Sequence, residues 1–400
     1  MQILFFVGLI MVLGSFMKFI SYKAKILNVV GYLILGLIIG PEFLNIIPQH
    51  FIDDSQIITD LSLSLISVLV GANLKYNVLK EVWKQVAIIS ILEAVFTFSF
   101  ISTIFYILFE FLDFGFTDKY RLIVSIIFGG LASATAPATI LAVIHELKIK
   151  TKFSSFLLGV VATDNAISLI LFSFIVIISN AIMNVGSCSY SIIFMVIPTV
   201  ILTIGVGIVG AGISEIIDRV FKNHKSIKTT STLGMIFLTY SLSQHWGLEP
   251  LLSSLVMGVV MSNLSADFCV VKKEFDQHLK DIIFLLFFTI SAMHLNISFL
   301  TSMPFVIILY ITFRILGKIA GVWTGAKISG ANKEVQKYLG IALFPQAGIA
   351  IGLALSLQDE AGFEAIAPII LNVIIATTMI HEFVGPLLTK YVLKKSVDSD

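Results

Sequence analysis

Apolar stretches long enough to cross a lipid bilayer follow one another along almost the whole chain. A helix needs roughly 17 to 25 apolar residues to cross about 30 Å of hydrocarbon, and a window of about 19 residues detects about thirteen such stretches. They lie near residues 2–20, 26–44, 57–74, 85–110, 120–146, 153–180, 190–217, 229–246, 249–264, 280–300, 304–327, 334–357 and 365–390. Only helices and closed barrels satisfy their backbone polar groups in lipid, so stretches of this length predict an all-α polytopic membrane protein.

The overall composition agrees with a chain that lies in lipid. Hydrophobic residues make up 57% of the sequence and charged residues 13%, whereas soluble domains carry about 25% charged residues. The net charge of +1 lacks the clustered excess of Lys and Arg that nucleic-acid binding needs. The N-terminus has no basic region or small-residue cleavage site, so we expect it to remain as the first span. The predicted partner is therefore the lipid bilayer, and no nucleic acid is expected.

The basic residues predict which way the chain crosses the membrane. If the N-terminus lies outside, all but four of the 26 Lys and Arg residues fall in inward loops or at inward span ends. The exceptions are Lys119, Arg121, Arg314 and Lys318. The positive-inside rule then places the C-terminus in the cytoplasm. We expect residues 1–395 to form a single membrane domain and residues 396–400 a short cytoplasmic tail, with no soluble regulatory domain.

Two charged residues are predicted to lie near the middle of the membrane. Asp164, in the stretch VVATDNAISLILFS, comes about eleven residues into its span, and a helix rises 1.5 Å per residue. Lys318 is expected at a similar depth. Charges at this depth cost a few kcal/mol and usually face a partner or a water-filled cavity. The pair thus indicates either a transport site or a buried ion pair that only joins two helices.

Two prolines in the middle of spans predict a pair of interrupted helices. Pro137 lies in ASATAPATILAV and Pro345 in IALFPQAGIAIGLAL, and proline removes a helical hydrogen bond. The two spans occupy corresponding positions in the first and last six spans, and an odd offset of seven spans inverts the second copy. Small residues such as Ala134 would let the two unwound backbones cross, with Gln346 beside Pro345. Paired broken helices in an inverted repeat are typical of a transport site; the alternative is two kinked helices without a function.

Six motifs in order resemble the bacterial monovalent cation:proton antiporters, in their sodium/proton exchanger branch. They are GYLILGLIIGPEFLNII, LASATAPATILAVIHELK, LLGVVATDNAISLILFSF, FRILGKIAGVWTGAK, LFPQAGIAIGLAL and EFVGPLLTK. The resemblance implies a homodimer in the bacterial inner membrane, and an elevator movement of an ion-translocating core against a dimerisation part. The dimerisation part corresponds to about residues 1–80 and 228–302, the core to about 81–180 and 303–395, and a linker helix to about 190–220.

The resemblance also implies the residues of an ion and proton site. Asp164 matches the acid that usually contacts the lysine of the RxxGK stretch, here Lys318, and Thr135 and Thr163 fall beside it. Asn165 stands where related exchangers carry a second aspartate. An asparagine can offer a carbonyl oxygen to a hard cation but cannot release a proton. We therefore expect exchange to depend on Asp164, at about one proton per cation.

Three further charges lie inside apolar spans. Arg314 is one turn from Lys318 and is expected to pair with Glu382 or Glu93, as structural support for the site. The segment FPQAG also lacks the arginine and acid that many relatives carry after the proline. His381 falls near a span end, where a water-exposed interfacial role is expected rather than pH sensing.

Several functions share these features. The transported ions are predicted to be H⁺ and Na⁺, with Li⁺ or K⁺ as possibilities, and neither a cofactor nor a metal other than the transported cation is expected. A potassium/proton antiporter, a sodium-coupled solute symporter and a transport-inactive sensor remain alternatives, the last because of Asn165. No enzyme is predicted, because no nucleophile with a base and no metal-ligand cluster appears in the spans.

Overall fold

The architecture comes from a computed structural model. It describes residues 2–24, 26, 28–72, 83–111, 117–136, 139–140, 143–144, 147, 151–185, 190–221, 225–265, 268–296, 304–346, 348–359 and 362–397. The chain divides into two compact units. Unit 1 comprises Met1–Ser55, Val82–Ser168 and Phe288–Asp400, and unit 2 comprises Gln56–Glu81 and Leu169–Phe287.

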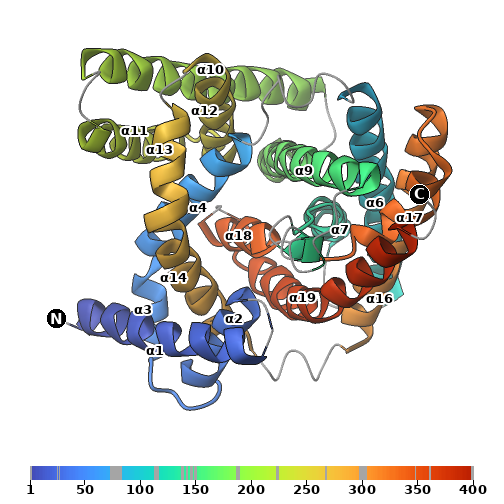
Figure 1. The fold of residues 1–400 in the computed structure, drawn as a ribbon, viewed down its shortest axis with the longest axis horizontal. Helices are drawn as coiled ribbons and strands as arrows, with labels where there is room; N and C mark the ends of the chain where they lie inside the picture. The colour runs from blue at the N-terminus through green and yellow to red at the C-terminus, as the bar shows by residue number, and fades with distance from the viewer. Residues whose placement is uncertain are drawn as a thin grey trace. The chain divides into compact units, whose positions relative to one another are not determined.

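Helices account for the regular structure of both units (Figure 1). Unit 1 contains α1 (Gln2–Ala24), α2 (Asn28–Ile39), α3 (Gln49–Asp54), α6 (Trp83–Phe111), α7 (Asp118–Ala132), the first half of α9 (Lys152–Val185), the end of α14 (Lys280–Met293), α16 (Pro304–Ile328), α17 (Lys333–Ala342), α18 (Gly348–Ser356), the short 3₁₀ turn Leu357–Asp359 and α19 (Ala367–Val397). Unit 2 contains α4 (Gln56–Gly71), the second half of α9, α10 (Tyr190–Val220), α11 (Lys225–His245), α12 (Pro250–Leu264), α13 (Phe268–Glu274), the π-helical turn Phe275–Leu279 and most of α14.

The lengths of these helices confirm an all-α polytopic membrane protein. In the described part of the chain, six helices are long and apolar enough to cross a membrane: Ile3–Ala24, Trp83–Phe111, Phe156–Met183, Ile197–Val220, Pro304–Ile328 and Ala367–Ser396. Three shorter apolar helices, α2, α4 and α12, accompany them. Large apolar side chains such as Leu4 and Phe5 are exposed on α1, as a surface facing lipid tails requires.

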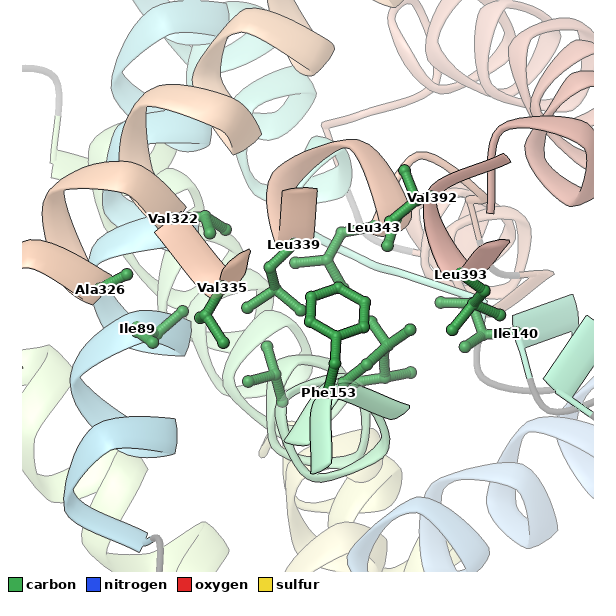
Figure 2. Close-up of a cluster of buried hydrophobic side chains, with 14 of the residues drawn as sticks. Ile89, Ile140, Phe153, Val322, Ala326, Val335, Leu339, Leu343, Val392 and Leu393 are labelled. Atoms are coloured by element: carbon green, nitrogen blue, oxygen red, sulfur yellow. The ribbon is translucent and has the colours of Figure 1, made fainter. Parts of the chain in front are cut away.

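A cluster of buried hydrophobic side chains packs five helices of unit 1 together. Figure 2 shows Ile89 of α6, Phe153 of α9 and Leu339 of α17 converging with residues of α16 and α19. These side chains are at most 3% exposed. Because this cluster fixes α6, α9, α16 and α17 against one another, polar side chains elsewhere on the same helices acquire fixed positions too.

Unit 2 has a core of its own. It joins Leu65 and Val68 of α4, Ala211 of α10, Ile236 of α11 and Met257 of α12. The short helix α13 and the π-helical turn after it lie where the sequence pattern predicts only a connection between two spans. Phe268 and Phe275, both buried, attach this segment to the core of unit 2, so tertiary packing explains its helical form.

Candidate functional site

The two interrupted helices predicted from the sequence are present and their backbones meet. Helix α7 ends at Ala132 and residues 133–136 are not helical, while α17 ends at Ala342 and α18 begins at Gly348. The Ala136 N–H donates a hydrogen bond of 3.0 Å to the Pro345 carbonyl, which joins the two unwound stretches directly. Pro137 lies outside the described residues, so only the second of the two prolines can be placed.

Small side chains allow this close meeting of two backbones. Ala132, Ser133, Ala134, Thr135 and Ala136 are all at most 3% exposed. A helix interruption frees backbone carbonyls, and a buried carbonyl without a partner costs free energy. The crossing therefore needs hydrogen-bond donors from elsewhere in unit 1.

Arg314 supplies three of those donors. Its Nε donates to Ala132 O at 2.9 Å, one terminal nitrogen donates to Ala134 O at 2.7 Å, and the other donates to Phe344 O at 2.7 Å. The guanidinium thus binds carbonyls of both unwound stretches, next to the C-terminal ends of α7 and α17. A cation at a helix C-terminus also interacts favourably with the helix dipole.

The expected pairing of Arg314 with Glu382 or Glu93 was wrong. Glu382, in α19, accepts a hydrogen bond from Thr139 Oγ1 at 2.7 Å, and Glu93 contacts Lys318. The guanidinium has five N–H donors in a rigid fork, so it can bind three carbonyls at once. Sequence spacing shows which face of α16 carries Arg314, but it does not show that this face points at freed carbonyls.

Lys318, one turn after Arg314, joins two carboxylates. Its Nζ lies 2.5 Å from Glu93 Oε1 and 3.5 Å from Asp164 Oδ2, and all three side chains are fully buried. It also donates to Ser133 O at 2.8 Å and to Thr135 Oγ1 at 2.9 Å. The predicted contact between Lys318 and Asp164 is therefore present, but the nearer carboxylate is that of Glu93 on α6.

Thr135 links the crossing to α9. Its hydroxyl donates to Asp164 Oδ2 while accepting from Lys318, and its backbone N–H donates to Asn165 Oδ1 at 3.3 Å. The Asn165 amide nitrogen donates back to Val161 O within α9. Asn165 thus holds the backbone of the first unwound stretch. Thr163 lies apart from this network, since its hydroxyl donates to Gly159 O of its own helix.

Glycines explain why Glu93 reaches Lys318. Gly317, Gly321 and Gly325 are four residues apart and share one face of α16. A Cβ atom at Gly321 would lie 2.5 Å from the Glu93 Cα, and Cβ atoms at the other two would lie 2.7 to 2.8 Å from Cα atoms of α6. Small residues at this spacing let two membrane helices approach closely. The pattern LGKIAGVWTGA is visible in the sequence and indicates such a face, although it does not name the partner helix.

Several buried oxygen atoms at the site remain available to a ligand. Among the described residues, Asp164 Oδ1, Glu93 Oε2 and Gln346 Oε1 have no hydrogen-bond partner. Gln346 is held through its amide nitrogen, which donates to the Tyr310 hydroxyl at 3.0 Å. Buried acceptors are almost always satisfied, and oxygen atoms are the ligands that hard monovalent and divalent cations prefer. The arrangement can therefore accept a proton or a small cation.

His381 is fully buried within α19, so the expectation of a water-exposed position was wrong. Its Nδ1 is 2.6 Å from Thr377 O, and its ring lies 4.8 Å from that of Phe344, between centroids. The helix continues to Val397, well past the apolar stretch predicted from the sequence. His381, although near the end of a predicted span, therefore lies in the buried interior of unit 1.

Comparisons with known proteins find similar chains and a similar fold. Residues 7–395 match the family model described as sodium/hydrogen exchanger, transmembrane. The ammonium/H⁺ antiporter subunit AmhT of Alkalihalophilus pseudofirmus is 23% identical over 362 residues, 88% of this chain and 85% of that protein. The Na⁺/H⁺ antiporter 1 of Methanocaldococcus jannaschii is 33% identical over 147 residues, which cover 36% of this chain and 32% of that protein. Among solved structures, the sodium proton antiporter MjNhaP1 of the same organism, at pH 8, has a TM-score of 0.79 and 22% identity, covering 99% of this chain and 98% of that one.

Proposed function

The chain belongs to the sodium/hydrogen exchanger family, a family of membrane antiporters, and from this premise we propose that it exchanges protons for sodium, or a similar monovalent cation, across the bacterial inner membrane. The observation that carries the proposal is Asp164. Its carboxylate is fully buried beside the crossing of two interrupted helices. Among the described residues no group donates a hydrogen bond to its Oδ1 atom, so this oxygen can bind a ligand. Interrupted helices that meet beside buried polar groups are the usual form of an ion site in transporters.

The exchange follows from competition at one carboxylate. An ionised Asp164 offers its open oxygen to a dehydrated cation, whereas a protonated Asp164 offers it a neutral group. Cation and proton therefore exclude each other, and whichever is in excess on the accessible side is carried. The contacts from Thr135 and Lys318 to Oδ2 hold the carboxylate in place while Oδ1 exchanges its ligand.

In the proposed mechanism, one part of the chain moves against another. The core of about residues 81–180 and 303–395 moves against a dimerisation part of about 1–80 and 228–302 in a homodimer, with 190–220 as a linker helix. This division by movement rests on the family resemblance and differs from the two units defined by contacts. The N-terminus lies outside and the C-terminus inside, as the distribution of basic residues supports.

A transport assay tests the proposal. Proteoliposomes with an acidic interior and a pH-sensitive dye receive sodium, lithium, potassium or ammonium in turn. Ammonium is included because AmhT carries the name of an ammonium antiporter, with protein-free liposomes as the control for ammonia diffusion. Wild-type protein is expected to dissipate the proton gradient with at least one cation. Asp164→Asn is expected to abolish this, and Glu382→Gln, which changes a buried carboxylate that bonds Thr139 instead, is expected to preserve it.

Other outcomes would select a different function. Cation movement that depends on an added organic solute would indicate a symporter. A folded wild-type protein that responds to none of the cations over a wide pH range would indicate a protein that does not transport, such as a sensor.

A further inference from the structure

Charge balance at the site raises a difficulty if Asp164 acts alone. An ionised Asp164 beside a positively charged Lys318 is already a neutral pair. Release of a bound cation would return the site to neutrality without any proton, so charge balance would not favour the uptake of a proton by Asp164. Asn165 cannot supply the coupled proton, because an amide side chain does not release a proton at physiological pH.

We propose that Glu93 is the second carboxylate of the ion site, and that it takes the part that an aspartate at position 165 would otherwise play. The inference rests on the function proposed above. In this view Glu93, Asp164 and Lys318 act as one cluster, and the cluster exchanges one proton for one monovalent cation.

The contacts show that Glu93, Asp164 and Lys318 form one cluster. The same nitrogen atom, Lys318 Nζ, contacts Glu93 Oε1 at 2.5 Å and Asp164 Oδ2 at 3.5 Å, and none of the three side chains is exposed. Each carboxylate uses one oxygen for these contacts, with Thr97 Oγ1 also donating to Glu93 Oε1 at 3.0 Å. The other oxygen of each, Glu93 Oε2 and Asp164 Oδ1, has no hydrogen-bond partner within the described residues.

The net charge of this cluster determines the coupling. With both acids ionised, two negative charges and one positive charge leave a net charge of −1. A net charge without water costs far more than a neutral, hydrogen-bonded group. One proton shared by the two carboxyl groups restores neutrality, and so does one bound Na⁺. When the cation arrives, the O–H bond breaks and the proton leaves to water; when the cation leaves, a carboxylate takes a proton from water.

The other ionisable groups near the cluster have partners of their own. Arg314 adds a positive charge, but that charge is the same whether a proton or a cation is bound, so it does not alter the one-for-one exchange. Arg314 is committed to three carbonyls at the C-terminal ends of α7 and α17. Glu382 bonds Thr139, and His381 contacts Thr377 O. Among the described residues, Lys318 forms ion pairs with Glu93 and Asp164 alone.

The first test counts protons released per sodium ion bound. Purified protein in weakly buffered detergent solution is titrated with sodium, or with whichever cation the wild type transports, while a pH indicator reports protons and equilibrium dialysis reports bound cation. Wild type is expected to release about one proton per cation. Glu93→Gln is expected to release almost none, because Asp164 and Lys318 are then neutral without a proton. The double variant Glu93→Gln/Asn165→Asp is expected to return to about one, and the control Glu382→Gln to equal wild type.

The rescue separates this role from a structural one. If Glu93 only anchored Lys318, an aspartate at position 165 would not restore proton release. Release of about one proton per cation from Glu93→Gln alone would overturn the proposal. A wild type that binds and moves no monovalent cation would instead overturn the proposed function on which it rests.

A second measurement needs no variant. If the cluster is neutral with either ligand, then wild-type exchange carries no net charge and its rate in proteoliposomes does not change with an imposed membrane potential. Exchange that speeds up or slows down several-fold with the potential would overturn the inference, even if Glu93→Gln failed to fold.

Discussion

Replacing Arg314 by lysine tests whether one guanidinium holds the crossing together. Arg314 donates three hydrogen bonds of 2.7 to 2.9 Å to carbonyls of both unwound stretches. The ammonium of a lysine is a single point and is expected to retain one of them. A hydrogen bond from a charged donor contributes about 1.5 to 3 kcal/mol, so losing two of three should lower the free energy of unfolding by about 3 to 6 kcal/mol.

The assay is unfolding of the purified protein by a titration of sodium dodecyl sulfate in mixed micelles, followed by helix content. Arg219→Lys is the matched control, because Arg219 is 71% exposed and pairs with Glu215 on the same helix. Such surface pairs contribute at most about 1 kcal/mol. An Arg314→Lys variant as stable as the Arg219→Lys control would refute the reasoning that the guanidinium satisfies the carbonyls of the crossing.

Two further predictions concern helix packing and a surface turn. Gly321→Ala places a Cβ 2.5 Å from the Glu93 Cα; we expect a loss of about 1 to 3 kcal/mol by overpacking together with slower exchange. Gly212→Ala, which has nothing within 4 Å, is expected to cause neither effect, and equal stability of the two variants would contradict the close approach of α6 and α16. Outside the spans, backbone N–H groups of Glu364 itself and of Gly362 hold the pKa of the Glu364 carboxyl below its usual value. A depressed pKa stabilises the fold above the unfolded-state pKa, so protection of the Gly362 amide from hydrogen exchange should fall as the pH drops through the folded-state pKa, and should not do so in Glu364→Gln.

The helices and the depth of the charges could be predicted from sequence because each depends on local properties. Apolar length alone determines which segments can cross the membrane, and the span limits follow within a few residues for most helices. Asp164 and Lys318 stand out because charged residues are rare in such segments. Their similar depth made a contact possible and the family resemblance implied it; in the structure Lys318 Nζ lies 3.5 Å from Asp164 Oδ2.

Partners across helices could not be predicted in the same way. Glu93 and Lys318 are 225 residues apart in the chain. Neither hydrophobic periodicity nor charge count indicates that α6 packs on the glycine face of α16. Arg314 was therefore expected to pair with Glu382 or Glu93, whereas Glu93 contacts Lys318, one turn further along the same helix.

A proline in a span does not by itself predict an interrupted helix. Pro345 lies in a break, whereas Pro198 and Pro386 lie inside the continuous helices α10 and α19. A proline removes one backbone hydrogen bond in every case, but a full break frees more carbonyls. Unwinding is stable at Pro345 because Ala136 N–H and Arg314 bind the Pro345 and Phe344 carbonyls. The donors that stabilise a break come from elsewhere in the fold, so the proline alone does not identify it.

The two buried cations of α16, Arg314 and Lys318, have different tasks, and each residue type suits its own. Arg314 faces backbone carbonyls, whose partial charges do not change during exchange, and its rigid fork can bind three of them at once. In the proposed exchange, Lys318 faces two carboxylates that gain and lose a proton. Its flexible ammonium can shift between Glu93 and Asp164, whereas a fork bound to both would compete with the cation for their oxygens. Lys318→Arg is therefore expected to keep the fold and weaken cation binding, the opposite of the effect expected for Arg314→Lys.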